Sequence, residues 1–368
     1  MLDPIEFQIR QDCLCAASSL PMLAHRLQGH HLAVVGGLGF VGSWLGHMVA
    51  ALNDEFAAGI KLTLIGRDTK KWRQQHPNLQ RSDILLAEVD VRSAFEFPRD
   101  TTLVIHAAGH ADPRVQASNP QRVYQSILFG LDNSLTAANR LEGIERFVNI
   151  SSGLVAGEVA ASTPVAENAI GVLDFKRLQN LYAEMRRAGE ALASGYASQY
   201  RLAISTVRAF TFLGPFQALD APWAVNNFIR DALSSHDIRV HGSGSSRRTY
   251  LYGSDVAAWL LQAALAGEDG GVYNLGGAEP VSHEQVAHWV SGLTVLKPRI
   301  LIRTRDGEDP RSQDFYPDLT HSKEALGVRV TMDVRTAIER TMRWSADRQG
   351  LSNRLTNDPP IGEPSAQP

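Results

Sequence analysis

Two residues that can carry proton chemistry stand four positions apart in the sequence, at Tyr182 and Arg186. They lie in residues 178–193, a stretch with a helical pattern, where positions i and i+4 share one face. A free tyrosine has a pKa of about 10 and needs a nearby positive charge to exchange a proton at neutral pH. A guanidinium on the same face supplies that charge. The pair is therefore a candidate acid/base with its electrostatic support.

A glycine-rich turn follows the apolar run at residues 31–35 and reads Gly-Gly-Leu-Gly-Phe-Val-Gly over residues 36–42. A dinucleotide site needs such glycines for a tight turn, for close approach to a pyrophosphate and for close packing of helix on strand. The free N–H groups of the helix that begins near Ser43 would face the phosphates. The alternative is a glycine-rich turn without a ligand, but a strand before and a helix after favour the dinucleotide site. We expect cofactor contacts at Gly36, Gly39, Phe40, Val41 and Gly42.

The GxxGxxG spacing of this turn resembles the fingerprint of the extended short-chain dehydrogenases/reductases, the NAD-dependent epimerase/dehydratase family. Similarity continues from about residue 30 to residue 345. The resemblance implies that Ser152, in the segment 151–157, is the catalytic hydroxyl that donates to the substrate oxygen. It makes Tyr182 the acid/base and places both Tyr182 and Arg186 beside the cofactor. It further implies cofactor contacts after the third and fourth strands, at Asp90, Val91, Ala107, Ala108 and Gly109.

The sequence departs from the family's YxxxK helix at one position, because Arg186 stands where the family has lysine. That lysine supplies the positive charge and holds the nicotinamide ribose. Arginine keeps the charge and adds donors, but it is bulkier and does not deprotonate. Two interpretations stay open. The chain has 30 Arg and 6 Lys, so the substitution could be an accommodated one; alternatively the chain could be a catalytically impaired NAD(P)-binding protein.

The end of the second strand bears on the choice between NAD and NADP. An NAD-specific site usually ends this strand with Asp or Glu, which binds the ribose 2′-hydroxyl. Here the strand ends at Gly66, followed by Arg67 and Asp68. Arg67 could pair with a 2′-phosphate, whereas Asp68 could reach a 2′-hydroxyl. The sequence favours NADP, with NAD as the alternative.

The residues after Ser152 narrow the reaction. The family's 4,6-dehydratases carry an Asp-Glu pair there, because elimination of water needs an acid and a base, and its decarboxylases keep a Glu. This sequence has Gly153 and Leu154, so both activities are disfavoured. The resemblance then implies an NAD(P)-dependent epimerase or 4-ketoreductase that acts on a nucleotide-diphosphate sugar, in bacterial surface-polysaccharide or deoxysugar biosynthesis.

A nucleotide diphosphate needs cations or amides to bind it, and the second half of the chain offers several at positions that resemble the family's motifs. The expected substrate contacts are Arg208, Asn227, Arg230, Arg248 and Arg311.

The elements that must position these residues follow an alternating order. Apolar runs at 31–35, 61–65, 84–89, 102–106, 146–150 and 202–207 predict strands, and helical patterns separate several of them. This order indicates an α/β fold, a Rossmann-type doubly wound parallel sheet with a smaller C-terminal α/β substrate lobe. We expect a helical extension at 1–29, the NAD(P)-binding domain at 30–207 and the substrate lobe at 208–349, with 248–265 packing back on the first domain. Residues 350–368 have the composition of a disordered tail.

Composition excludes other classes of protein. A net charge of −3 gives no case for nucleic acid or anionic membrane. No apolar run reaches the roughly 20 residues that span a bilayer, and the N-terminus lacks the features of a signal peptide, so we expect a cytoplasmic protein. Cys13 and Cys15 are too close in sequence to favour a disulfide, and no second ligand pair suggests a metal site. The resemblance implies a homodimer that pairs through two helices per subunit.

Overall fold

The computed structural model describes residues 3–109, 111–158, 163–174, 176–303 and 314–356. Its central sheet has seven parallel strands in the order β11-β6-β5-β4-β1-β2-β3. All five residues of β1 are buried, as expected for a parallel strand that is covered on both faces. The strands are β1 (His31–Val35), β2 (Lys61–Gly66), β3 (Ile84–Glu88), β4 (Leu103–His106), β5 (Arg146–Ser152), β6 (Ile204–Ala209) and β11 (Val272–Leu275).

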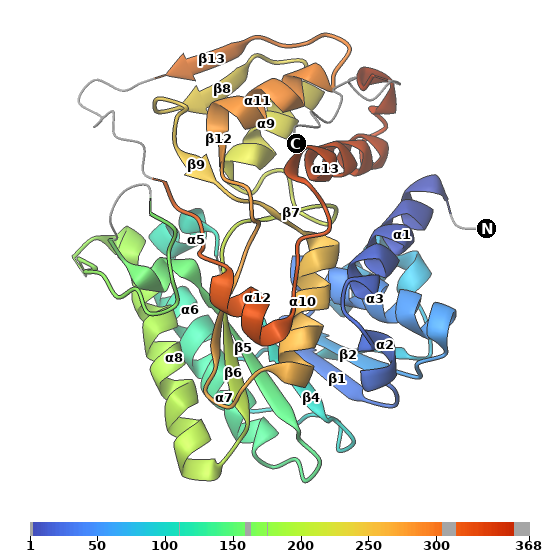
Figure 1. Cartoon of the computed structure of the whole chain (residues 1–368), viewed down its shortest axis with the longest axis vertical. Helices are drawn as coiled ribbons and strands as arrows, with labels where there is room; N and C mark the ends of the chain where they lie inside the picture. Colours follow the sequence, from blue (N-terminus) through green and yellow to red (C-terminus); the bar gives the residue numbers. More distant parts are fainter. Residues whose placement is uncertain (1–2, 110, 159–162, 175, 304–313, 357–368) are drawn as a thin grey trace.

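Helices cover both faces of the sheet (Figure 1). One layer consists of α1 (Pro4–Ser18), α2 (Leu23–Arg26), α3 (Phe40–Phe56) and α10 (Gly253–Ala266), and the other contains α6 (Pro120–Tyr124), α7 (Gly130–Ala138) and α8 (Leu181–Tyr200). A π-helical turn, η2 (Gln125–Phe129), joins α6 to α7. Shorter segments complete this half: α4 (Thr69–Gln75), η1 (Pro77–Leu79), α5 (Pro113–Ser118), η3 (Gly153–Ala156) and η4 (Leu178–Asn180).

A smaller lobe stands over the carboxyl ends of the strands (Figure 1). It contains α9 (Ala224–Leu233), α11 (His283–Gly292), α13 (Val334–Arg348) and the parallel pair of β8 (Ile238–His241) with β13 (Ile300–Arg303). Two further pairs are β7 (Phe212–Leu213) with β10 (Leu251–Tyr252), and β9 (Arg247–Arg248) with β12 (Val281–Ser282). Helix α12 (Thr320–Leu326) descends to pack on β11 and α10, and η5 (Ser352–Arg354) ends the described chain.

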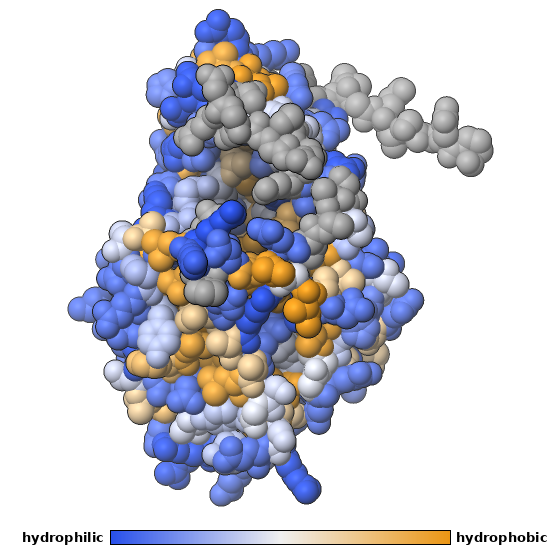
Figure 2. Space-filling view, turned by 90° about the vertical axis from the view of Figure 1, so that its left-hand side faces the viewer, coloured by the Kyte–Doolittle hydropathy of each residue, from blue (hydrophilic) through white to orange (hydrophobic). Residues whose placement is uncertain are grey.

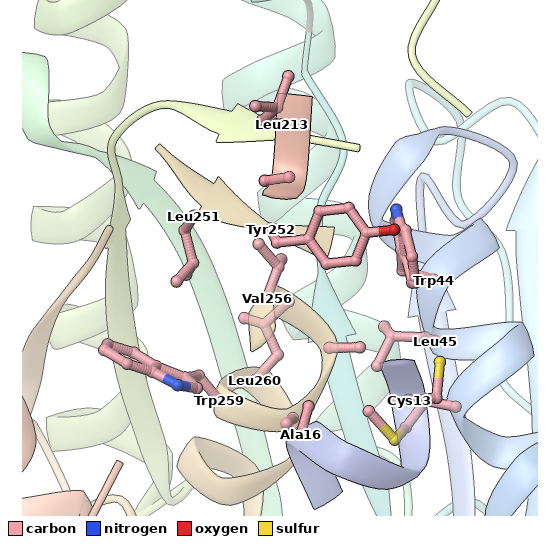
Figure 3. Close-up of a cluster of buried hydrophobic side chains, with 14 of the residues drawn as sticks. Cys13, Ala16, Trp44, Leu45, Leu213, Leu251, Tyr252, Val256, Trp259 and Leu260 are labelled. Atoms are coloured by element: carbon pink, nitrogen blue, oxygen red, sulfur yellow. The ribbon is translucent and has the colours of Figure 1, made fainter. Parts of the chain in front are cut away.

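One hydrophobic core runs from the sheet into the smaller lobe where α1, α3 and α10 meet (Figure 3). The Tyr252 ring lies 5.0 Å from the Trp44 ring in an edge-to-face contact, and its hydroxyl donates to Asp12 on α1 at 3.0 Å. The N-terminal helix is therefore built into the core of the protein. Both cysteines are free, with Cys13 buried and Cys15 exposed.

The α/β class and the parallel sheet are confirmed, but β11 was not foreseen. Its four residues supply the seventh strand, next to β6. The chain past residue 349 also stays ordered further than its composition suggested, since Leu355 is buried and bridges to Thr294. Within the described residues no helix is long and apolar enough to cross a membrane.

Candidate active site

The glycine turn lies at the point where the strand order reverses, between β1 and β4. Gly36 has a φ of +76°, and a Cβ there would lie 2.8 Å from the backbone of Ala108 after β4. A Cβ on Gly42 would lie 1.9 Å from the carbonyl oxygen of Gly37. Gly39 begins α3 without a side-chain cap, which leaves the first turn of this helix, at Phe40 and beyond, open toward a ligand. A side chain at Gly36 or Gly42 would therefore collide with backbone, and a tight turn of this kind fits the close approach of a dinucleotide pyrophosphate.

The residues expected near the adenine lie beyond β2 and β3. A Cβ on Gly66 would lie 2.7 Å from Cγ of Leu38, so a side chain at the strand end would have to displace that leucine. Arg67 and Asp68 are exposed, and Asp68 accepts a hydrogen bond from the Lys71 N–H at 2.9 Å as the N-cap of α4.

Asp90 and Val91 follow β3 at the same edge of the sheet. The Arg92 guanidinium binds the Asp90 carboxylate, with Nε at 2.9 Å, and holds the pKa of that carboxyl well below its usual range. Val91 packs on the start of α7, where a Cβ on Gly130 would lie 3.0 Å from its Cγ2.

Tyr182 and Arg186 meet as the helical spacing predicted, and both are buried. Arg186 Nε donates to the Tyr182 hydroxyl at 3.2 Å, and its other nitrogens donate to the carbonyl oxygens of Ile150 at 2.8 Å and Ala108 at 3.3 Å. Gly109 has a φ of +144°, and a Cβ there would lie 2.3 Å from Arg186 Nη2. The guanidinium is thus fixed between the ends of β4 and β5, with its positive charge at the phenol.

Ser152 ends β5 and caps the turn η3, since its Oγ accepts a hydrogen bond from the Leu154 N–H at 3.2 Å. The neighbouring Ser151 donates to the Glu190 carboxylate on α8 at 2.5 Å. A Cβ on Gly153 would lie 2.5 Å from the ring of Phe210, which follows β6. A side chain at the position directly after Ser152 would therefore have to displace the Phe210 ring.

His106 is the last residue of β4 and lies near Arg186. It is fully buried, and its Nδ1 lies 3.1 Å from Ser134 Oγ. Burial, and then the nearby Arg186, lower the pKa of its imidazole to about 3. The ring is therefore neutral at physiological pH, and Arg186 carries the positive charge there.

Arg208 does not fit the substrate contact expected from the sequence. Its Nε and Nη2 donate to the two oxygens of Glu190 at 3.0 and 2.8 Å, and its Nη1 donates to the carbonyl oxygen of Glu167 at 2.5 Å. These bonds use three of the five N–H groups of the guanidinium within the fold, and the side chain is only 11% exposed, which favours a structural role over a grip on a diphosphate.

The other expected substrate contacts are in the smaller lobe. Arg230 on α9 donates to Asn227 Oδ1 at 2.8 Å and to the carbonyl oxygen of Leu219 at 3.2 Å. Arg248 lies over the ring of Phe315, 5.9 Å from its centroid, and burial lowers the pKa of its guanidinium. Phe315 in turn stacks on Phe210 at 5.0 Å. An aromatic path thus connects Arg248 to the Ser152 turn, while Arg311 lies outside the described residues.

We assigned no role to Glu190 from the sequence, although its spacing from Tyr182 and Arg186 indicates that it belongs to the site. It is eight residues after Tyr182 and four after Arg186, which puts the three side chains on one face of α8. Phe210 and Phe315 left no such signal, because aromatic residues after strands are usually part of the core. Within the described residues no group of His, Cys, Asp and Glu is suited to hold a metal.

Comparison with known proteins places this geometry in a family. The sequence model of the NAD-dependent epimerase/dehydratase family matches residues 32–276. Two relatives from Arabidopsis thaliana are UDP-glucuronic acid decarboxylase 5, 28% identical with 83% of this chain and 86% of that protein covered, and UDP-glucuronate 4-epimerase 5, 27% identical with 86% and 75% covered.

Solved structures share the fold. An epimerase from Methanothermobacter thermautotrophicus superposes with a TM-score of 0.77 at 21% identity, over 90% of this chain and 97% of that one. A UDP-glucuronic acid 4-epimerase from Bacillus cereus, solved in complex with NAD, has a TM-score of 0.71 at 19% identity, over 86% and 99%. Because the sequence match takes in the glycine turn, Ser152 and Tyr182 on one continuous fold, the chain belongs to the NAD-dependent epimerase/dehydratase family.

Proposed function

We propose that this protein is an NAD(P)-dependent epimerase or 4-ketoreductase that acts on a nucleotide-diphosphate sugar. The contact between Arg186 Nε and the Tyr182 hydroxyl carries the proposal, because it provides a buried phenol with a fixed positive charge at 3.2 Å. That charge stabilises the phenolate that forms when Tyr182 gives up its proton. It also favours an active site over the alternative of an impaired NAD(P)-binding protein, since the arginine keeps a positive charge at the phenol.

The remaining side chains have separate tasks. Gly36, Gly42 and the start of α3 would hold the pyrophosphate, and the nicotinamide, when bound, supplies hydride transfer at the sugar carbon. Ser152 Oγ accepts from the Leu154 N–H, so its own hydrogen is left to donate to the sugar oxygen. Tyr182 takes or returns the proton of that oxygen. Arg248 and Arg230 are the proposed diphosphate contacts.

The crowding of Gly153 by Phe210 supports a reaction without elimination. Dehydration needs an acid and a base in addition to the tyrosine, and Gly153 and Leu154 supply neither. Decarboxylation is the competing activity, because several relatives at about this similarity are UDP-glucuronic acid decarboxylases. Gly153 and Leu154 occupy the positions that would carry the extra carboxylate.

Product analysis tests the proposal. The purified protein is incubated with UDP-glucuronate, UDP-glucose, UDP-N-acetylglucosamine or a nucleotide 4-keto sugar, with and without added NADPH, and the products are separated by ion-pair chromatography and mass spectrometry. An epimerase yields an isomer of unchanged mass without net cofactor turnover, whereas a ketoreductase consumes NADPH in equal amount to product. A dehydrated or decarboxylated sugar would contradict the proposal.

We further propose that the protein is a homodimer paired through α8 and the α6–η2–α7 helix. Apolar side chains gather on the face that carries these helices (Figure 2). Tyr124 and Phe129 are 37% and 42% exposed and contact each other edge to face, and Leu178 ahead of α8 is 47% exposed. Exposed apolar groups that lie together are typical of contact surfaces. Light scattering should give twice the mass of one chain, and a monomer across the micromolar range would refute the pairing.

A further inference from the structure

A largely buried ion pair lies next to the Ser152 turn and joins three elements of the site. The Glu190 carboxylate on α8 accepts hydrogen bonds from Ser151 on β5 and from Arg208 on β6. The side chains of Arg208 and Glu190 are 11% and 17% exposed. The fork of the guanidinium matches both carboxylate oxygens, which fixes the relative direction of strand and helix.

The same arginine reaches a second carboxylate-bearing residue. Arg208 Nη1 donates to the backbone carbonyl of Glu167, and the Glu167 side chain accepts from the Asn274 N–H at 2.9 Å and from Ser322 Oγ at 3.2 Å. Asn274 belongs to β11 and Ser322 to α12. The ion pair thus connects the Ser152 turn with the edge strand of the central sheet and with α12.

The position of the Glu190–Arg208 ion pair favours a role in orienting the residues of the site over a role in stabilising the fold. Replacing a buried ion pair by apolar side chains of similar volume is often neutral or stabilising, so such pairs contribute little net stability. A pair that holds Ser151 also sets the direction of Ser152, because successive residues of a strand point to opposite faces. Glu190 shares its helix face with Tyr182. The same carboxylate therefore contacts Ser151, the neighbour of Ser152, and lies on the helix that carries Tyr182.

We propose that Glu190 and Arg208 are positioning residues, which hold Ser152 and Tyr182 in the geometry that the reaction needs. This inference rests on the proposed function of that site. A displacement of about 1 Å in a reacting group can cost on the order of a hundredfold in rate. The pair acts through Ser151 and α8, with no contact to the sugar itself.

The test separates positioning from folding. In the double variant Glu190→Leu/Arg208→Met both charges are removed together, so no uncompensated charge stays buried. We expect its midpoint of thermal unfolding to stay within about 5 °C of the wild type. We expect its kcat to fall at least about 30-fold while KM for the nucleotide sugar changes less than about threefold. Unchanged kcat in the folded double variant would overturn the proposal.

Two further variants sharpen the result. Arg208→Lys keeps the charge but loses the fork, so it should fold and recover part of the kcat that the double variant loses; no recovery would count against positioning by the ion pair. Arg146→Met breaks the Arg146–Asp269 pair at the start of β5, the strand that ends at Ser152. Asp269 is 71% exposed there. This variant is the matched control and should leave kcat unchanged, and a loss as large as that of the double variant would contradict the proposal.

Hydrogen exchange provides a measurement that does not need turnover, so it stands even if none of the sugars is a substrate. The Leu154 N–H is held by Ser152 Oγ. In the double variant its exchange should become at least about tenfold faster, since each tenfold step corresponds to about 1.4 kcal/mol of lost local protection. The backbone amide of Val148, in the middle of β5, should keep its wild-type exchange rate. Equal protection of Leu154 in both proteins would overturn the positioning role.

Discussion

Two glycines of this site stand where a neighbouring side chain crowds the position of a Cβ atom. A Cβ on Gly153 would collide with Phe210, and one on Gly66 would collide with Leu38. The first position follows the proposed catalytic serine, and the second lies at the proposed ribose edge of the cofactor site. A side chain at either glycine would have to displace the neighbouring side chain, of Phe210 or of Leu38.

Arg186 gives a direct test of whether the site is active or impaired. Its three nitrogens satisfy a phenol and two backbone carbonyls, whereas a lysine has one nitrogen to serve them. We expect Arg186→Lys to lower kcat about tenfold and Arg186→Met to lower it at least about a hundredfold, which is the range of a lost acid/base contribution. Steady-state kinetics and cofactor titration check this. A strong rise in turnover for Arg186→Lys, at unchanged cofactor affinity, would instead favour the impaired site.

Arg67 decides the proposed preference for NADP. It is exposed beyond the end of β2, where Gly66 provides no acidic group for a 2′-hydroxyl. A guanidinium can bind a 2′-phosphate through two hydrogen bonds, so Arg67→Ala should weaken NADPH binding at least about tenfold and leave NADH binding within about twofold. Fluorescence titration of both cofactors measures the change, with Arg73→Ala in α4 as the control. Solved neighbours were crystallised with NAD or NADH, and tighter binding of NADH to the wild type would reverse the preference.

At the scale of elements, the β1–α3 turn is the part of the site most sensitive to a single atom. Gly36 combines a positive φ with a backbone contact at 2.8 Å, whereas Gly59 has a φ of +63° and nothing within 4 Å of a Cβ. Alanine at either position should cost about 1 kcal/mol of stability for the left-handed backbone. Only Gly36→Ala must also move the turn away from Ala108.

The paired substitutions separate strain from crowding. We expect Gly36→Ala to reduce cofactor affinity at least about tenfold, because the backbone can no longer approach the pyrophosphate, while Gly59→Ala keeps the affinity of the wild type. Calorimetric titration gives the affinities and thermal unfolding gives the stabilities. Equal affinities in the two variants would show that the turn at Gly36 does not hold the cofactor.

The elements that carry the site were predictable to different degrees. Six strands were visible as apolar runs, and the spacing of Tyr182 and Arg186 placed them on one helix face. The strand β11 was missed because its residues, Val-Tyr-Asn-Leu, are few and include a buried asparagine. Arg208 was assigned to the substrate because a sequence shows a charge but not its partner, and Glu190 is distant in sequence. Pairings between elements decide what a side chain is free to do, and these emerge only in the folded chain.

At the scale of the whole molecule, three distant segments meet at one buried junction. Glu6 of α1, His47 of α3 and Arg348 of α13 come together there. Glu6 lies 3.7 Å from both His47 Nδ1 and Arg348 Nη2. Burial, followed by the nearby His76, lowers the pKa of His47 to about 3, so the ring is neutral at physiological pH and the ion pair is that of Glu6 with Arg348. His47 stacks instead on Phe216, at 4.9 Å.

This junction should make the protein sensitive to acid. Burial also lowers the pKa of His76 to about 4, whereas an unfolded histidine has a pKa of about 6.5. Each ring therefore contributes stability above pH 6.5 that is lost as the pH falls toward 4, at up to about 1.4 kcal/mol per pH unit and group. Burial raises the pKa of Asp255 to about 6, so this carboxyl binds a proton in the folded state first and opposes part of the loss.

His47→Phe keeps the stacking on Phe216 and removes one titrating ring from the junction. We expect the wild type to lose stability between pH 6.5 and pH 4.5, and the variant to lose it less steeply by about 1 kcal/mol per pH unit. Urea unfolding followed by tryptophan fluorescence at several pH values gives the slopes. His25→Phe on α2, where the ring is exposed to water, is the matched control and should keep the wild-type slope. If His47→Phe also keeps the wild-type slope, the titration of His47 is not the source of the acid sensitivity.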